Sequence, residues 1–382
     1  MKIGLIGNGK MGKEIFWFFF NNSNYLKVAC VEGAEEFQAL IEKNLRKMNK
    51  RGTLTDEELE EKLRSFEVSY DFGILSDCDL VIEAIFENED LKADVFSKVE
   101  KIVSDKCILV SNTSSIPLGK VFSKCEKKSR CAGMHFFYPV KLSGFIELNT
   151  ENFTDKETEK AISSLITGGE KKVVRFSGNY NMYLNKVISI AVSHSLLWKN
   201  KNSYSYSEIN DILEKKFMAY SAFTMVDSVG IGIISASTVY FSDERCGYLL
   251  DISDRLFKEL SDAGCGKGPG CFMEFVTGME NGHEVYGDSE KENEFLLSLS
   301  ALLLNDIVGA CLNSGTDSSS LKKAVEDVLN LSEKFDDLYT RYGYENISSC
   351  LSKYFSDTKC LIYKPYSKEE YELIFTKKGE VK

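Results

Sequence analysis

The chain has 382 residues, of which 43% are hydrophobic and 27% are charged, and its formal net charge is −11 at pH 7. A chain of this length is expected to divide into two or three domains. Its negative charge gives no long-range attraction for nucleic acid or for an anionic membrane surface, so neither is expected as a partner. An acidic ligand would have to be met by local Lys and Arg side chains.

The eleven cysteines are odd in number and scattered, which argues against a disulfide framework and favours free thiols in a reducing, cytoplasmic setting. No cysteine pair has zinc-ligand spacing, and Cys265 and Cys271 lie in a glycine loop, so no metal site is expected. The first predicted strand begins at residue 2, so we expect no signal peptide. We also expect that no apolar stretch is long enough to cross a membrane.

The amino terminus carries a glycine loop between a predicted strand over residues 2–7 and a predicted helix. Gly7 permits a tight turn, Gly9 lets backbone N–H groups approach a pyrophosphate, and Gly12 lets the helix lie close to the sheet. An acidic residue, Glu32, ends the next apolar run twenty residues beyond Gly12. A carboxylate there can accept both ribose hydroxyls but repels a 2′-phosphate. The pattern predicts a dinucleotide site that takes NAD rather than NADP.

Residues 1–177 alternate apolar strands with helices, which is typical of an α/β doubly wound parallel sheet. The predicted strands cover 2–7, 26–32, 66–70, 79–83, 107–111, 131–135, 144–148 and 171–176. A charged helical stretch over 35–64 separates the second strand from the third and contains the basic run 44–51. This run is either a solvated helical face or a cationic site for a phosphorylated substrate, and the sequence leaves both open.

Two segments bring polar residues to the carboxyl ends of neighbouring predicted strands. The strand 79–83 leads to Glu87, with Lys92 on the following helix, and the strand 107–111 runs into the polar segment 111–115, which contains Ser114. Ligands of open α/β sheets bind at this edge. Taken alone, the segment 111–115 is more typical of a helix cap or a turn.

The strand 131–135 ends in His135, one of three histidines, and Glu147 follows twelve residues later on a short predicted strand. A lone buried histidine is more often a core residue than a catalyst. A carboxylate within reach, however, fixes the imidazole tautomer and raises its proton affinity, as a general base near neutral pH requires. Oxidation of a hydroxyl group by NAD needs such a base. His194 and His283 are expected to serve packing or solvent roles.

From residue 180 onward, strand signals give way to apolar segments of helical period, which predicts an all-α region. These segments cover 184–198, 209–220, 246–263, 294–313 and 321–342. The first segment with the helices after it is faintly echoed by 295–313 with 321–338. We therefore divide the chain into residues 1–177, 178–280 and 281–382.

Four segments together resemble the 3-hydroxyacyl-CoA dehydrogenase family of fatty-acid oxidation. They are GNGKMG at 7–12, VIEAIFENEDLK at 81–92, ILVSNTSSIPL at 108–118 and GMHFFYPVKLSGFIEL at 133–148. The likeness runs through most of residues 1–176. It implies a Rossmann-type doubly wound sheet followed by an all-α carboxyl-terminal region of two related helical domains. It also implies NAD-dependent oxidation of an L-3-hydroxyacyl-CoA to its 3-ketoacyl-CoA.

The resemblance implies a role for each matching residue. His135 would be the base, Glu147 its orienting partner, and Ser114 a hydrogen-bond donor near the substrate carbonyl and the nicotinamide. Asn185 would be an active-site asparagine. The implied cofactor contacts are Gly7, Asn8, Gly9, Lys10, Met11, Gly12, Glu32, Glu87, Lys92, Ser114 and Lys267. The acyl-CoA substrate is expected to meet Asn44, Lys50, Arg51 and Ser114.

The chain departs from the family pattern in three places. Tyr138 stands where the family has the asparagine of HFFNP, and the segment 181–186 keeps Asn185 but lacks the Pro and Gly of a PGF turn. The segment 221–227 replaces a turn that closes the acyl pocket. These changes leave the proton and hydride machinery in place and bear on the acyl-chain preference.

Two alternative functions stay open. One is a dehydrogenase of a small 3-hydroxy acid without CoA, and the other is a catalytically weak NAD-binding protein. The long helical region is compatible with a monomer or a homodimer, because a second helical copy could cover the face that a partner subunit covers in shorter members.

Overall fold

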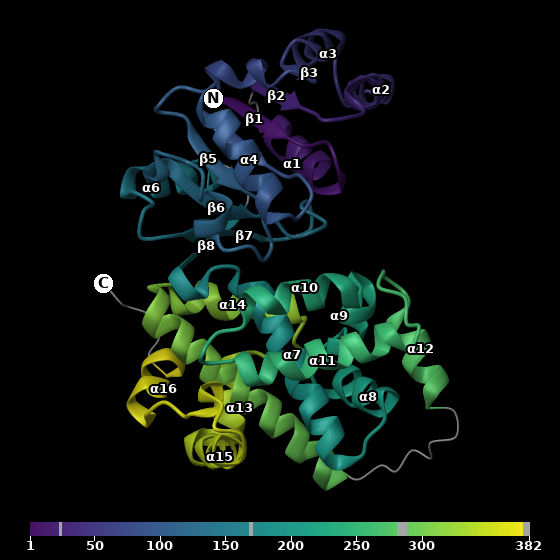
Figure 1. Cartoon of the computed structure of the whole chain (residues 1–382), viewed down its shortest axis with the longest axis vertical. Coiled ribbons are helices and arrows are strands. Elements are labelled where there is room, and N and C mark those ends of the chain that lie inside the picture. The colour runs from purple at the N-terminus through teal and green to yellow at the C-terminus, as the bar shows by residue number, and fades with distance from the viewer. Residues whose placement is uncertain (23–24, 168–170, 281–288, 377–382) are drawn as a thin grey trace. The chain divides into compact units, whose positions relative to one another are not determined.

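The computed structural model describes residues 1–22, 25–167, 171–280 and 289–376, and the chain divides into two compact units (Figure 1). The first unit, Met1–Asn181, is an α/β structure, and the second, Met182–Lys382, is built of helices. The boundary falls four residues beyond the predicted one. The predicted division of the helical region at 280/281 adjoins residues 281–288, which lie outside the described residues, and it stays a prediction.

The first unit contains an eight-stranded sheet in the order β3-β2-β1-β4-β5-β6-β7-β8. Every predicted strand is present, with ends shifted by at most three residues. The strands are β1 (Lys2–Ile6), β2 (Tyr25–Ala29), β3 (Phe66–Ser69), β4 (Leu80–Glu83), β5 (Ile108–Ser111), β6 (Cys131–His135), β7 (Phe145–Thr150) and β8 (Lys172–Ser177).

The sequence predicted a sheet that is parallel throughout, but one pair of its strands is antiparallel. The strands from β3 to β6 run parallel, β7 pairs antiparallel with β6, and β8 runs parallel to β7. The chain order reverses between β1 and β4, and such a switch point opens a crevice at the carboxyl ends of the strands. The carboxyl ends of β1, β4, β5 and β6 therefore lie along one edge.

An aromatic cluster fixes the helix that follows the glycine loop against the sheet. The helices of this unit are α1 (Lys10–Asn21), α2 (Ala34–Lys50), α3 (Asp56–Leu63), α4 (Glu89–Glu100), α5 (Leu118–Val121) and α6 (Lys156–Thr167). On α1, Phe16 and Phe20 stack at 5.0 Å between ring centroids, and Phe37 of α2 meets Phe16 edge-on at 5.5 Å. All three rings are buried in one core with the apolar residues of β1 and β2. Such pairs add to the stability gained by burial and hold α1 in one orientation.

The second unit contains the five predicted helical segments and several shorter helices that the sequence did not reveal. Its helices are α7 (Tyr183–Asn202), α8 (Tyr206–Lys216), α9 (Ala222–Val229), α10 (Ile231–Phe241), α11 (Gly247–Asp262), α12 (Phe272–Met279), α13 (Ser289–Ser314), α14 (Ser318–Leu329), α15 (Phe335–Thr358) and α16 (Lys368–Phe375). The segment 321–342 is divided between α14 and α15. The helices α9 and α10 meet at Gly230 with a bend of 106°, and α9, with eight residues, is too short to show a helical period.

The expectation about membrane-spanning length is wrong for α13. This helix has 26 residues and is long and apolar enough to cross a membrane, and α9 with α10 also qualifies if the bent pair is counted as one span. However, 83% of the most apolar window of α13 is buried inside the protein. A helix in the centre of a folded unit is surrounded by protein, so it is expected to be apolar on all sides.

His194 lies fully buried in α7, in the packing role that the sequence predicted, whereas His283 lies outside the described residues. The Nδ1 atom of His194 is 2.8 Å from the Tyr363 hydroxyl, and its Nε2 atom is 2.9 Å from the Ser298 hydroxyl. The Ser298 hydroxyl donates to the Phe295 carbonyl, so Nε2 carries the proton and Nδ1 accepts one. Burial, with a smaller contribution from the charge of Lys201, lowers the pKa of His194 to about 3.

This lowered pKa predicts a loss of stability in weak acid. Below pH 6.5 the unfolded histidine binds a proton that the folded one refuses, so the free energy of unfolding should fall by about 2 kcal/mol between pH 7.5 and pH 5 from this group alone. In a His194→Gln variant this contribution should vanish. Urea unfolding of both proteins at the two pH values measures the difference. An equal pH dependence in the two proteins would contradict the assignment.

Candidate active site

The three glycines of the amino-terminal loop differ in what surrounds them. A Cβ added to Gly7, whose φ is +102°, would lie 2.7 Å from the Ala84 carbonyl oxygen, and one added to Gly12 would collide with the Gly7 carbonyl. A Cβ on Gly9 would meet nothing within 4 Å. Gly7 and Gly12 are therefore required by the fold. Gly9 instead leaves open space at the start of α1, which fits close approach of a dinucleotide pyrophosphate.

Asn8 joins the glycine loop to the acidic residue that follows β2. Its side-chain amide donates to the carbonyl oxygens of Glu32, at 2.9 Å, and Gly33, at 3.0 Å. Glu32 lies exposed in the loop beyond Ala29, the last residue of β2. This arrangement suits a carboxylate that receives the ribose hydroxyls of the adenosine half of a dinucleotide.

One face of α1 docks on the segment that follows His135. Lys10 lies with its Nζ 3.6 Å from the centroid of the Tyr138 ring, and the Glu14 carboxylate accepts from the Val140 N–H at 3.1 Å. Phe18 meets Phe136 at 5.6 Å between ring centroids. Lys10, Glu14 and Phe18 are spaced four residues apart, so they share one side of the helix.

These contacts give a structural role to a residue that departs from the family pattern. Tyr138 replaces an asparagine, and its ring receives the ammonium of a glycine-loop lysine through a cation–π contact. Met11, the neighbour of that lysine, is partly buried against the core. The loop expected to bind the cofactor is thus tied to the strand end that carries His135.

His135 and Glu147 form a buried pair across two neighbouring strands. They face each other in the antiparallel ladder of β6 and β7, and His135 Nδ1 lies 2.7 Å from Glu147 Oε2. The Glu147 side chain is fully buried, and that of His135 is 6% exposed. The ring of Phe137 packs against the imidazole at 4.4 Å. The antiparallel register therefore explains how two residues twelve positions apart come into contact.

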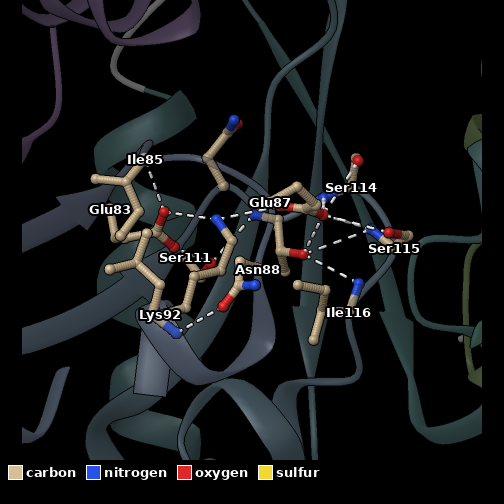
Figure 2. A network of polar contacts seen from close by, with 12 residues as sticks. Glu83, Ile85, Glu87, Asn88, Lys92, Ser111, Ser114, Ser115 and Ile116 are labelled. Atoms are coloured by element: carbon tan, nitrogen blue, oxygen red, sulfur yellow. Dashed lines mark hydrogen bonds and ion pairs between the residues drawn. The ribbon is translucent and has the colours of Figure 1, made fainter. Parts of the chain in front are cut away.

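A buried polar network joins the carboxyl ends of β4 and β5 (Figure 2). We call it the Glu83–Lys92–Glu87 network, and it also includes Ser111 and Thr113. Lys92 Nζ donates to Glu83 Oε1 at 2.6 Å and lies 3.1 Å from Glu87 Oε2. The Ser111 hydroxyl donates to Glu83 Oε2 at 2.5 Å, and the Thr113 hydroxyl donates to Glu87 Oε1 at 2.6 Å. Because the Thr113 N–H donates to the Ser111 hydroxyl oxygen at 3.1 Å, these contacts form a closed ring.

Lys92 is enclosed by this network, and the direct cofactor contact that the resemblance implies stays a prediction. Its side chain is 1% exposed and that of Glu83 is fully buried, whereas 34% of the Glu87 side chain is exposed. Burial raises the pKa of Glu87, but the Lys92 charge and hydrogen bonds from Thr113 and Ser114 outweigh it and hold the pKa below its usual value. Glu87 is therefore the charged member of the network that a ligand can reach.

Ser114 and Asn112 connect this network to His135. The Ser114 N–H donates to Glu87 Oε1 at 2.8 Å, and its hydroxyl lies 3.2 Å from the same oxygen. The Asn112 side-chain oxygen accepts from the Phe136 N–H at 2.9 Å. Sequence reasoning brought the segment 111–115 to this edge but gave no separate role to Ser111, Asn112 or Thr113, and it did not identify Glu83. The signal that could have found Glu83 is a carboxylate inside a buried apolar strand, which needs a partner.

Five of the predicted site residues lie on α2, at its end, or in the other unit. Asn44, Lys50 and Arg51 are on α2 or at its end, with Lys50 and Arg51 exposed. Basic residues in the last turn of a helix also interact favourably with its dipole, so their contact with a substrate stays a prediction. Asn185, partly buried on α7, and Lys267, on an exposed loop before α12, belong to the second unit. Their contribution to the site stays a prediction as well.

Comparison with known proteins identifies the family. Residues 2–179 match the family model of the 3-hydroxyacyl-CoA dehydrogenase NAD-binding domain. The 3-hydroxybutyryl-CoA dehydrogenase of Mycobacterium tuberculosis is 32% identical over 196 residues, which cover 49% of this chain and 67% of that protein. The chain belongs to the 3-hydroxyacyl-CoA dehydrogenase family. NAD is therefore the cofactor of its first unit.

Further relatives and a solved structure extend the comparison. The peroxisomal fatty acid beta-oxidation multifunctional protein of Oryza sativa subsp. japonica is 35% identical over 182 residues, or 47% of this chain. The match spans a quarter of that protein's length and a third of the glyoxysomal multifunctional protein of Brassica napus. A crystal structure of 3-hydroxybutyryl-CoA dehydrogenase from Escherichia coli K12 superposes with a TM-score of 0.77 at 16% identity and covers 98% of both chains. This last likeness shows a shared fold.

The glycine loop gives a matched pair of substitutions in this protein. Gly9→Ala should leave the melting temperature close to that of the wild type but weaken NADH binding by tenfold or more, because its Cβ would occupy space that the pyrophosphate needs. Gly12→Ala should lower stability by about 1 to 3 kcal/mol through overpacking. Thermal unfolding and NADH fluorescence titration measure the two effects. Wild-type NADH affinity in Gly9→Ala would refute the expected contact.

Proposed function

We propose that this chain oxidises an L-3-hydroxyacyl-CoA to the 3-ketoacyl-CoA with NAD, and catalyses the reverse reduction. The observation that carries the proposal is the buried contact between His135 and Glu147, at the same sheet edge as the glycine loop and Ser114. Oxidation of a secondary alcohol needs a base for the hydroxyl proton and an acceptor for the hydride. The first unit supplies the base, and bound NAD supplies the hydride acceptor.

His135 would act through Nε2, because Nδ1 lies against the Glu147 carboxylate. With Nδ1–H donating to Glu147, Nε2 is unprotonated and can accept the hydroxyl proton. The resulting imidazolium is stabilised by the buried negative charge of Glu147, which offsets the cost of charging a group that is almost excluded from water. In the reduction, the same nitrogen returns the proton.

Ser114 can serve as the donor to the substrate oxygen at small cost. Its hydroxyl lies 3.2 Å from Glu87 Oε1, whereas the Thr113 hydroxyl and the Ser114 N–H hold the same oxygen at 2.6 and 2.8 Å. The long contact is the weakest of the three. Turning the Ser114 hydroxyl toward a ligand would therefore leave Glu87 with strong partners.

The choice of substrate and compartment is part of the proposal. The relatives named as 3-hydroxybutyryl-CoA dehydrogenases and beta-oxidation multifunctional proteins support an acyl-CoA substrate. All eleven cysteines are free, and each of them is buried or partly buried. Free thiols support a reducing compartment such as the cytoplasm. The oligomeric state, monomer or homodimer, stays a prediction.

The test is oxidation of NADH with acetoacetyl-CoA, followed by the loss of NADH absorbance. A His135→Gln variant should lose turnover by roughly a thousandfold, within the range for removing a general acid or base. NADPH should be a much poorer donor, because Glu32 repels a 2′-phosphate.

The matched control is His194→Gln, which changes the other described histidine and should leave turnover within about twofold. Full turnover in His135→Gln would remove the proposed base. A folded wild-type protein that binds NADH but does not reduce acetoacetyl-CoA would exclude the acyl-CoA proposal, and acetoacetate would then be tried as a free acid.

A further inference from the structure

The hydrogen bonds of the Glu83–Lys92–Glu87 network define its charge. Glu83 Oε1 accepts from the Ile85 N–H at 2.7 Å and from the Lys92 ammonium, and Oε2 accepts from the Ser111 hydroxyl. The Ser111 oxygen is already the acceptor for the Thr113 N–H, so its own proton points to Glu83. Both oxygens of Glu83 are therefore acceptors, as in an ionised carboxylate.

Glu87 is ionised by the same reasoning. The Thr113 oxygen accepts from the Ile116 N–H at 3.0 Å, so the Thr113 hydroxyl proton points to Glu87 Oε1. The second oxygen, Oε2, pairs with the Lys92 ammonium. Two carboxylates thus share one ammonium, and the network carries one net negative charge. Water cannot fully screen this charge, because Glu83 and Lys92 are buried.

The strand order places this charge beside the nicotinamide half of the cofactor. A dinucleotide lies across the switch point between β1 and β4, with one mononucleotide on each side. Glu32 follows β2 and marks the adenosine side. Glu87 follows β4, Ser114 follows β5, and His135 ends β6, all on the opposite side.

We propose that the net negative charge of the Glu83–Lys92–Glu87 network strengthens binding of the oxidised cofactor, whose nicotinamide ring is positive, relative to binding of the reduced cofactor, whose ring is neutral. Glu87 is the member that faces the ligand. Glu83 and Lys92 act as positioning residues, since they reach the cofactor only through Glu87. The inference rests on the proposed function only for placing the nicotinamide on the His135 side.

The His135–Glu147 pair holds a second fixed negative charge, that of the Glu147 carboxylate. When a hydroxyl group is oxidised, the nicotinamide ring loses its positive charge and the imidazole gains one. One unit of positive charge therefore leaves the vicinity of the network and appears beside Glu147. Each location holds a negative charge that the fold has already fixed, so the balance between the two sites sets the equilibrium on the protein.

The test compares dissociation constants for NAD⁺ and NADH, measured by calorimetry or fluorescence titration without any turnover. In Glu87→Gln, the ratio of the NAD⁺ constant to the NADH constant should rise roughly tenfold, as expected for loss of one partly screened charge near the ring. Glu83→Gln should raise the same ratio to a similar extent, because it leaves Lys92 and Glu87 as a neutral pair. If Glu83→Gln does not fold, Glu87→Gln decides alone, since its side chain is partly exposed.

Two controls separate charge from structure. Asp94→Asn removes a carboxylate from α4, the helix that carries Lys92. Asp94 pairs with Lys124 at the surface, so this variant should leave the ratio unchanged within about twofold. ADP-ribose lacks the nicotinamide, so its affinity should change little in any variant.

An unchanged ratio in Glu87→Gln, with both cofactors weakened equally, would overturn the proposal and leave Glu87 as a simple contact. A rise of the same size in Asp94→Asn would also overturn it. Because the measurement needs only binding, failure of the acyl-CoA reaction would not affect it. A wild-type protein that binds neither cofactor would overturn the proposal together with the cofactor site.

Discussion

The hydrogen-bonding register between β6 and β7 decides what the first unit can do, because it sets Glu147 directly opposite His135. A shift of one residue would turn the carboxylate to the other face of the sheet and leave a nearly buried histidine without a charged partner. The proposed proton chemistry thus depends on the antiparallel turn after β6. The segment that connects β6 to β7 also contacts α1. Its Tyr138 ring lies under the Lys10 ammonium, and its Val140 N–H donates to Glu14.

Two sets of contacts link the end of β6, which carries His135, to the glycine loop and to the ends of β4 and β5. The aromatic core holds α1, and the face of α1 that docks on the segment after His135 links the glycine loop to the base. The Asn112 side chain links the end of β5 to the residue after His135, and the Glu83–Lys92–Glu87 network links β5 to β4. The strand ends on both sides of the switch point are therefore held by buried contacts rather than by loops alone. Reacting groups that are fixed before a ligand binds need little reorganisation during a reaction.

The sequence predicted the parts of this site that depend on local pattern. Apolar runs located all eight strands, the glycine spacing located the loop between β1 and α1, and the twelve-residue separation of His135 and Glu147 suggested a pair. The antiparallel direction of β7 was missed, because the same alternation of apolar residues suits either direction. The burial of Lys92 between Glu83 and Glu87 was not foreseen, because it depends on three segments that meet only in the folded chain. The short helices α9 and α12 were missed because eight residues give too few turns for a period to show. The apolar length of α13 was underestimated because Asn305 and Asp306 interrupt its apolar sequence.

The central claim is that Glu147 keeps His135 in the tautomer that leaves Nε2 free to accept a proton. The chain has three histidines, so a spectrum of the protein labelled with ¹⁵N-histidine contains three imidazoles, and a His135→Gln variant assigns the signal of interest. At a pH where His135 is neutral, its Nδ1 should show the chemical shift of a protonated nitrogen and its Nε2 that of an unprotonated one, and Glu147→Gln should weaken this preference. A proton on Nε2 in the wild-type protein would contradict the account, because that nitrogen could not then act as the base.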